Sequence, residues 1–278
     1  IALVKPIAIR MFNLQGTSDE YFQEVEDKLT EETDYKLEIS QSMKVIEDCE
    51  KIDNLLFPHY YPEYSSDKII TMDWMNGIHL SEFCSSNASQ EQRDKVGQTL
   101  WNFYMYQIHQ LKKFHADPHP GNFLVDKNDN LIAIDFGCMK EIPNDFYVPY
   151  FEVSTPESLK DMDYFTKKLY ELEILKTTDK PKELEFFTDL FHELLSVFTR
   201  PMNEVEFDFA DLKFQNDIAA LSEKFASDKT LRKMNGNRGS KHFIYVNRTF
   251  FGLYSLMFDI KAKVKINDFE KYLNLKIK

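Results

Sequence analysis

Glycine is scarce in this 278-residue chain: its 8 glycines nowhere form the Gly-x-Gly-x-x-Gly spacing that would cover nucleotide phosphates. The 3 cysteines, Cys49, Cys84 and Cys138, have neither a Cys-x-x-Cys pair nor zinc-ligand spacing, so we expect free thiols in a reducing compartment. Basic residues are also in deficit, because 34 Lys and Arg face 46 Asp and Glu. The resulting net charge of -12 argues against a nucleic-acid partner.

Long hydrophobic runs are missing as well. The most apolar run, Phe250 to Phe258, is about half the length that a membrane-spanning helix needs, so we expect no crossing of a membrane. The chain starts at Ile1 with neither an initiator Met nor a charged leader, from which we expect it to be the interior of a longer protein.

The hydrophobic pattern predicts helices with a few short strands between them. Helical spacing and an N-cap at Ser18 predict an acidic helix over 19–49, broken near Thr33. Strands are expected at 68–77 and, as a hairpin, at 122–125 and 131–134. The remaining expected helices span 90–114, 145–154, 156–176, 181–199, 208–227 and 239–260, and we expect only helices after Asp145.

Two short motifs carry the chemistry: the run from His115 to Asn122, and Asp135-Phe136-Gly137. Asp117 would accept the acceptor's proton or orient the nucleophile, while Asn122 and Asp135 would bind the metal ions that accompany nucleotide phosphates. Prolines after Asp117 and His119 disfavour helical geometry and stiffen the loop, as a positioned base requires. The pattern favours a nucleotide-using phosphotransferase or ATPase.

Two other interpretations of these motifs stay open. They could be plain turns, although their joint occurrence around a predicted hairpin disfavours this. Alternatively, His115, Asp117 and His119 could bind zinc from a loop, but the intervening prolines and the lack of a further nearby His weaken that hypothesis. For His115 we favour a structural role, bonding to the backbone around the Asp-Phe-Gly turn.

Together with Glu32-Thr33-Asp34-Tyr35, these motifs resemble the UbiB/AarF family of atypical protein-kinase-like proteins. The resemblance is specific over about 20–141 and looser around 247–254. It implies that Glu32 and Asp34 are the Glu-x-Asp signature on the kinase αC helix. It also implies that Glu26 pairs with the lysine of the third kinase strand. Lys5 resembles that lysine, but Pro6 follows it directly, so we expect the true lysine to lie upstream of Ile1.

The same resemblance implies that the 69–77 strand links two lobes. Met72 would be the gatekeeper, and the backbones of Asp73 and Met75 would bond the adenine edge. The family's Ala-rich phosphate loop and Lys-x-Gly-Gln element are not found in the sequence, and we expect the nucleotide loop to lie upstream of Ile1. Ala116 replaces the Arg that reads a phosphorylated activation loop, and no Ala-Pro-Glu follows Gly137, so we expect no switch by phosphorylation of that loop. The peptide-docking platform of protein kinases is also missing, so we expect no protein phosphorylation in trans.

The predicted fold is therefore α+β and protein-kinase-like, with an incomplete N-lobe at 1–76 and a large, mostly helical C-lobe at 77–278. The resemblance implies ATP and Mg²⁺ as cofactors and a role in isoprenoid quinone biosynthesis or related lipid metabolism, with an isoprenoid lipid or quinone-biosynthesis proteins as partners. We expect a cytoplasmic location, with peripheral membrane association through the C-terminal aromatic helix. The alternatives are an aminoglycoside- or choline-type phosphotransferase and a non-catalytic pseudokinase scaffold.

Overall fold

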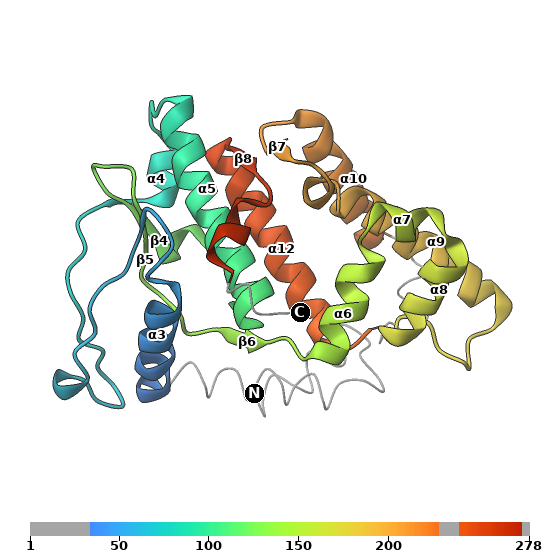
Figure 1. Cartoon of the computed structure of the whole chain (residues 1–278), viewed down its shortest axis with the longest axis horizontal. Coiled ribbons are helices and arrows are strands. Elements are labelled where there is room, and N and C mark those ends of the chain that lie inside the picture. The colour runs from blue at the N-terminus through green and yellow to red at the C-terminus, as the bar shows by residue number, and fades with distance from the viewer. Residues whose placement is uncertain (1–33, 228–238, 274–278) are drawn as a thin grey trace.

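The structure is a computed structural model that describes residues 34–227 and 239–273. Figure 1 shows the strands β4 and β5 with α3 at one end, α5 and α12 side by side in the middle, and α6 to α10 at the other end. The α-helices of this part are α3 (Tyr35–Cys49), α4 (Leu80–Ser85), α5 (Gln90–Tyr106), α6 (Asn144–Val153), α7 (Pro156–Lys160), α8 (Met162–Glu171), α9 (Pro181–Phe198), α10 (Leu212–Ser227) and α12 (Lys241–Ile260).

The strands of the described residues are short and form three small sheets. They are β1 (Leu55–Leu56), β2 (Ile78–His79), β3 (Lys113–His115), β4 (Phe123–Val125), β5 (Leu131–Ala133), β6 (Met139–Glu141), β7 (Glu206–Asp208) and β8 (Lys263–Lys265). The largest sheet has the order β1-β5-β4-β2, with β1 parallel to β5 and the other pairs antiparallel. The predicted hairpin is confirmed as β4 and β5, whose turn is held by Asp126.

Helix α5 is the centre of the core. A capping box between Ser89 and Gln92 starts it, and its buried face includes Leu100, Trp101 and Tyr104. The predicted continuation of this helix to residue 114 is wrong. It changes into the π-helical turn η2 (Gln107–Leu111), and the left-handed backbone of Lys112, with φ 53°, then directs the chain into β3.

Helix α3 begins directly after Asp34, which caps it by accepting a hydrogen bond from the backbone N–H of Leu37 at 3.1 Å. The predicted break near Thr33 thus falls at the edge of the described residues. The 3-10 turns η1 (Pro62–Tyr64), η3 (Pro120–Asn122), η4 (Pro201–Asn203) and η5 (Asp268–Tyr272) complete the secondary structure of the described residues.

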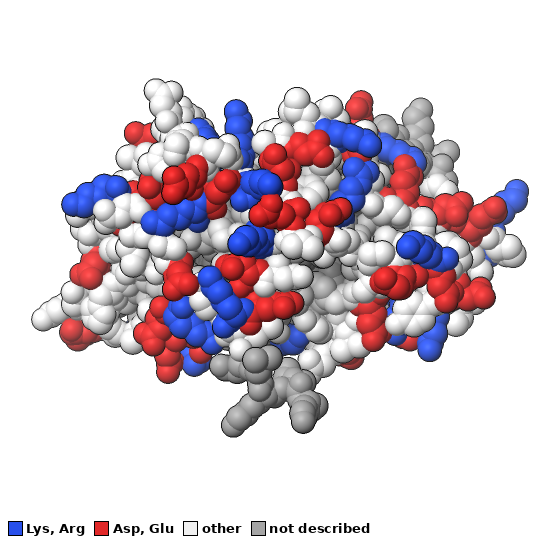
Figure 2. All heavy atoms as spheres, turned by 45° about the horizontal axis from the view of Figure 1, so that its top comes forward, with Lys and Arg blue, Asp and Glu red and all other residues white. Residues whose placement is uncertain are grey.

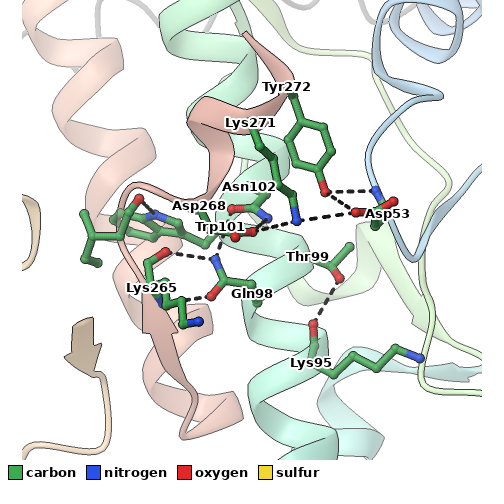
Figure 3. A network of polar contacts seen from close by, with 11 residues as sticks. Asp53, Lys95, Gln98, Thr99, Trp101, Asn102, Lys265, Asp268, Lys271 and Tyr272 are labelled. Atoms are coloured by element: carbon green, nitrogen blue, oxygen red, sulfur yellow. Dashed lines mark hydrogen bonds and ion pairs between the residues drawn. The ribbon is translucent and has the colours of Figure 1, made fainter. Parts of the chain in front are cut away.

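The segment after α12 is fastened to α5 by polar contacts (Figure 3). Indole Nε1 of Trp101 donates to the carbonyl of Ile266 at 2.9 Å, and Asn102 donates to Asp268 at 2.7 Å. Beyond them, the hydroxyl of Tyr272 donates to the carboxylate of Asp53 at 3.0 Å. These contacts join the end of the described chain to residues far away in sequence.

Several sequence predictions need correction. The stretch 68–77 is not a regular strand: it makes one isolated bridge, Tyr60 to Met72, flanked by backbone hydrogen bonds from Tyr61 to Thr71 and from Asp73 to His59. The expected helix at 156–176 is broken at Asp161, whose side chain caps α8 by accepting from Tyr164 N. The region after Asp145 also contains β7 and β8, which pair with each other.

The prediction that the C-terminal aromatic helix contacts a membrane is wrong about which surface of the protein could do so. In α12, Phe250, Leu253 and Tyr254 are buried in the core, so this aromatic face is not available to a lipid surface. Among the described helices, none is long and apolar enough to cross a bilayer. Figure 2 shows Lys and Arg interspersed with Asp and Glu over the face in view.

Candidate active site

The loop that carries Asp117 and the loop that carries Asp135 lie side by side. Strands β3 and β6 pair in antiparallel register, with His115 opposite Met139. One step further, the N–H of Ala116 donates to the carbonyl of Cys138 at 2.8 Å. The ladder therefore fixes the start of the first loop against the end of the second.

The β4–β5 hairpin joins the other ends of the two loops. Because Phe123 is opposite Ala133, the residues just outside the ladder also face each other, and Ile134 N donates to the carbonyl of Asn122 at 3.0 Å. The hairpin thus delivers Asn122 and Asp135 to the same edge of the sheet.

Hydrogen bonds within the first loop set the direction of its side chains. The carbonyl of Asp117 accepts from the backbone N–H of His119 at 2.8 Å and from the side-chain amide of Asn122 at 3.1 Å. Nδ1 of His119 in turn accepts from Gly121 N at 3.1 Å. Since the amide nitrogen of Asn122 is engaged, its Oδ1 is the atom left to meet a cation.

Phe136 anchors the second loop in the core. Its ring is 1% exposed and packs against Phe57 and Phe103, with ring centroids 5.9 and 6.5 Å apart. The carboxylate of Asp135 then folds back to accept from Gly137 N at 2.9 Å. Burying Phe136 therefore leaves the neighbouring Asp135 at the surface, in a restricted position.

His115 lies inside the protein beneath the two loops. Its backbone N–H donates to the side chain of Gln107 at 3.0 Å, and its Nδ1 is 3.5 Å from the hydroxyl of Tyr104. Burial lowers the pKa of His115, although the charges of Asp135 and Asp117 oppose that shift. These contacts are those of a structural residue, but they are made with side chains of α5 and η2 rather than with the backbone that we expected.

The zinc hypothesis finds no support. In the described part of the chain, no group of three His, Cys, Asp or Glu side chains is arranged to hold a metal ion. His115 is enclosed, and Nδ1 of His119 already accepts a backbone hydrogen bond.

A cavity of about 610 Å³ opens beside these loops, and Asp117, Asn122 and Asp135 all line it. Sequence reasoning missed three other lining residues: Tyr35, Glu38 and Lys68. The structure thus brings together the three side chains that the motifs singled out, and it adds a wall from α3.

Glu38 is the most informative of the missed residues. Burial, and secondly the negative charge of Asp135, raise its pKa, so the two carboxyl groups interact across the cavity. A signal was present in the sequence, since Glu38 is four residues after Asp34 and therefore one helical turn further along α3.

Of the other predicted site residues, those that the structure describes do not line this cavity. Asp34 caps α3, while Glu26, Glu32 and Lys5 lie outside the described residues. Ile69 and Ile70 line the cavity, but the proposed adenine-contacting residues Met72, Asp73 and Met75 do not. Asp73 instead accepts from the hydroxyl of Tyr61 at 2.9 Å, and its N–H donates to His59. The roles assigned to all these residues stay predictions.

The catalytic-type loop, the Asp-Phe-Gly loop and the helix across the cavity from them define a kinase-like protein. The matching family model is that of the ABC1 atypical kinase-like domain, over residues 2–168. The chain belongs to this family, and the UbiB/AarF resemblance is thereby confirmed.

Comparisons with known proteins agree with this assignment. The chain is 28% identical over 180 residues to Protein ACTIVITY OF BC1 COMPLEX KINASE 7, chloroplastic, of Arabidopsis thaliana, a match covering 63% of this chain and 26% of that protein. It is 30% identical over 118 residues to Atypical kinase COQ8, mitochondrial, of Saccharomyces cerevisiae, covering 42% of this chain and 22% of the relative. The matches thus span about a quarter of the length of these relatives.

A solved structure supports the fold. Rv3197 of Mycobacterium tuberculosis, solved in complex with erythromycin, superposes with a TM-score of 0.70 over 94% of this chain and 63% of the other, at 21% identity. The predicted α+β, kinase-like fold is confirmed by this likeness and by the family match.

Proposed function

We propose that the cavity binds ATP together with Mg²⁺ and that the protein transfers the terminal phosphoryl group to water or to a non-protein acceptor. The observation that carries this proposal is the meeting of Asp117, Asn122 and Asp135 at one cavity. The chain belongs to a kinase-like family, which supports a kinase-type enzyme.

The donor atoms suit magnesium. Mg²⁺ prefers oxygen ligands and is commonly held by one or two carboxylates together with substrate phosphates. Asp135 offers a carboxylate, and Asn122 offers an amide oxygen because its nitrogen donates to the carbonyl of Asp117. Bound there, the ion would supply positive charge to the phosphate oxygens during transfer.

The charge of the cavity supports the same conclusion. Glu38, Asp117 and Asp135 place three carboxyl groups on its wall, and Lys68 is the lysine that lines it in the described residues. A polyphosphate entering alone would meet net repulsion, whereas a divalent cation would be attracted. We therefore expect nucleotide binding to require the metal.

Asp117 is suited to orienting the acceptor. Its main chain is fixed by the loop's own hydrogen bonds, while its side chain stays 50% exposed beside the cavity. In this position, it would accept a hydrogen bond from a hydroxyl or a water molecule and take up the proton as the acceptor attacks.

The biological setting is also part of the proposal. From the family resemblance we propose support of isoprenoid quinone biosynthesis or related lipid metabolism, without protein phosphorylation in trans, and a cytoplasmic protein at the periphery of a membrane. We further propose that residues 1–76 belong to the N-lobe and 77–278 to the C-lobe. The names of the relatives assign those proteins to chloroplasts and mitochondria.

Nucleotide binding by the full-length protein tests the function. Calorimetric titration of ATP with and without Mg²⁺ should show binding that needs the metal and that Asp135→Ala abolishes. Asp163→Ala is the matched control, because Asp163 is an exposed aspartate on α8, a helix that contributes no residue to the lining of the cavity. Absence of nucleotide binding by the wild type would overturn the proposal and favour a scaffold.

A further inference from the structure

A guanidinium from the far end of the sequence contacts the Asp117 carboxylate. Nη2 of Arg248, on α12, lies 3.2 Å from Oδ1 of Asp117, although the two residues are separated by 131 positions. The loop from His115 to Asn122 has no lysine or arginine of its own. Arg248 therefore brings to this carboxylate a positive charge that its own loop does not provide.

The helix behind Arg248 is held firmly in place. Thr249 and Phe250, the next two residues, are fully buried, so the helix cannot turn about its axis without breaking the core. One turn beyond Arg248, Gly252 faces the same loop so closely that an added Cβ would collide with Cγ of Pro118. Two successive turns of α12 thus contact Asp117 and Pro118, one through charge and one through close packing.

We propose that Arg248 is a positioning residue that holds the Asp117 carboxylate from α12 through Oδ1 and leaves the other oxygen for the phosphoryl acceptor. This inference rests on the proposed function for its catalytic consequence. An exposed ion pair adds little to stability, so a contact of this kind between 67% and 50% exposed side chains has its main effect on orientation. Small misplacements of a reacting group cost rate steeply.

The test is a double-mutant cycle on the full-length protein. Arg248→Gln should lower kcat for ATP hydrolysis about 10- to 100-fold, with unchanged nucleotide affinity, because a misplaced carboxylate slows the chemistry and not the binding. Arg248→Lys should recover part of the loss by restoring the charge. In an Asp117→Asn background, Arg248→Gln should have no further effect on kcat, since Arg248 acts through Asp117.

Arg200→Gln is the matched control, because Arg200 also forms an ion pair between partly exposed side chains, with Asp217 at 2.7 Å, and neither residue lines the cavity. It should leave kcat unchanged. An Arg248→Gln effect that persists in full in the Asp117→Asn background, or no effect on kcat at all, would overturn the inference.

A second measurement, of thermal stability, does not depend on ATP hydrolysis. The melting temperatures of Arg248→Gln, Asp117→Asn and the double variant should be non-additive if the pair exists in solution, and additive values would overturn it. A wild type that binds no nucleotide would instead remove the proposed function, and the thermal cycle would still decide the contact.

Discussion

His109 should make the fold sensitive to mild acid. Its ring lies in the π-helical turn η2, stacks on Phe269 with centroids 5.0 Å apart, and packs against Phe151. Its Nδ1 is 2.7 Å from the hydroxyl of Tyr147. Burial lowers the pKa of His109 from 6.5 to about 4, and the positive charge of Lys112 acts in the same direction.

The direction of the change in stability with pH follows from the lowered pKa of His109. A histidine that is harder to protonate in the fold than in the unfolded chain stabilises the fold above pH 6.5, and that stability is lost as the pH falls from 6.5 to about 4. The full difference corresponds to about 3 kcal/mol of unfolding free energy, and about 1.4 kcal/mol of it should be gone at about pH 5.5.

Urea denaturation of the wild type and His109→Gln across this pH range measures the effect. Glutamine does not titrate, so the stability of the wild type relative to the variant should fall by about 3 kcal/mol between neutral pH and about pH 4. Tyr147→Phe removes the hydrogen bond but keeps the titrating ring, and its pH dependence should match that of the wild type. Parallel curves for wild type and His109→Gln would refute the reasoning.

Two further predictions concern the walls of the cavity. Because burial and Asp135 raise the pKa of Glu38, the stability that this shift contributes is present below pH 4.5 and is lost as the pH rises through the raised pKa. Glu38→Gln should therefore have a higher melting temperature than the wild type at neutral pH and the same melting temperature near pH 4. A difference in melting temperature that does not change with pH would contradict this prediction. Gly252→Ala should push α12 away from Pro118 and lower the free energy of unfolding, measured by chemical denaturation, by about 1–3 kcal/mol. Ser255→Ala, a change at an exposed position of the same helix, should leave it unchanged. Equal stability of the two variants would exclude the close packing of Gly252 against Pro118.

Much of the site could be predicted from the sequence because its contacts are local. The loop from Asp117 to Asn122 is held by bonds that span at most five residues. The hairpin that brings Asn122 opposite Ile134 is encoded by two short apolar runs and a turn. Patterns of this length can be interpreted without knowing the rest of the fold.

The remainder depends on pairings between distant segments. β7 and β8 pair across more than fifty residues, and nothing in either three-residue strand distinguishes it from the neighbouring helices. The stretch 68–77 has the composition of a strand, but a strand needs a partner along its length, and the described neighbour is the short segment around Tyr60. Arg248 has no local feature that would connect it with Asp117.

The charges of the residues around the cavity explain why side chains that are distant in sequence belong to one site. Asp117 and Asp135 are close enough to influence the same histidine, and Glu38 adds a third carboxyl group that senses Asp135. Left uncompensated, such a group of like charges would oppose the approach of any phosphate. Arg248 offsets the charge of Asp117 on one side, which leaves Asp135 and Glu38 facing the part of the cavity where a cation would bind. This arrangement fits the proposed roles, in which Asp117 orients the acceptor and Asp135 helps to hold the metal, and the parts of Arg248 and Glu38 could not be predicted from the motifs alone.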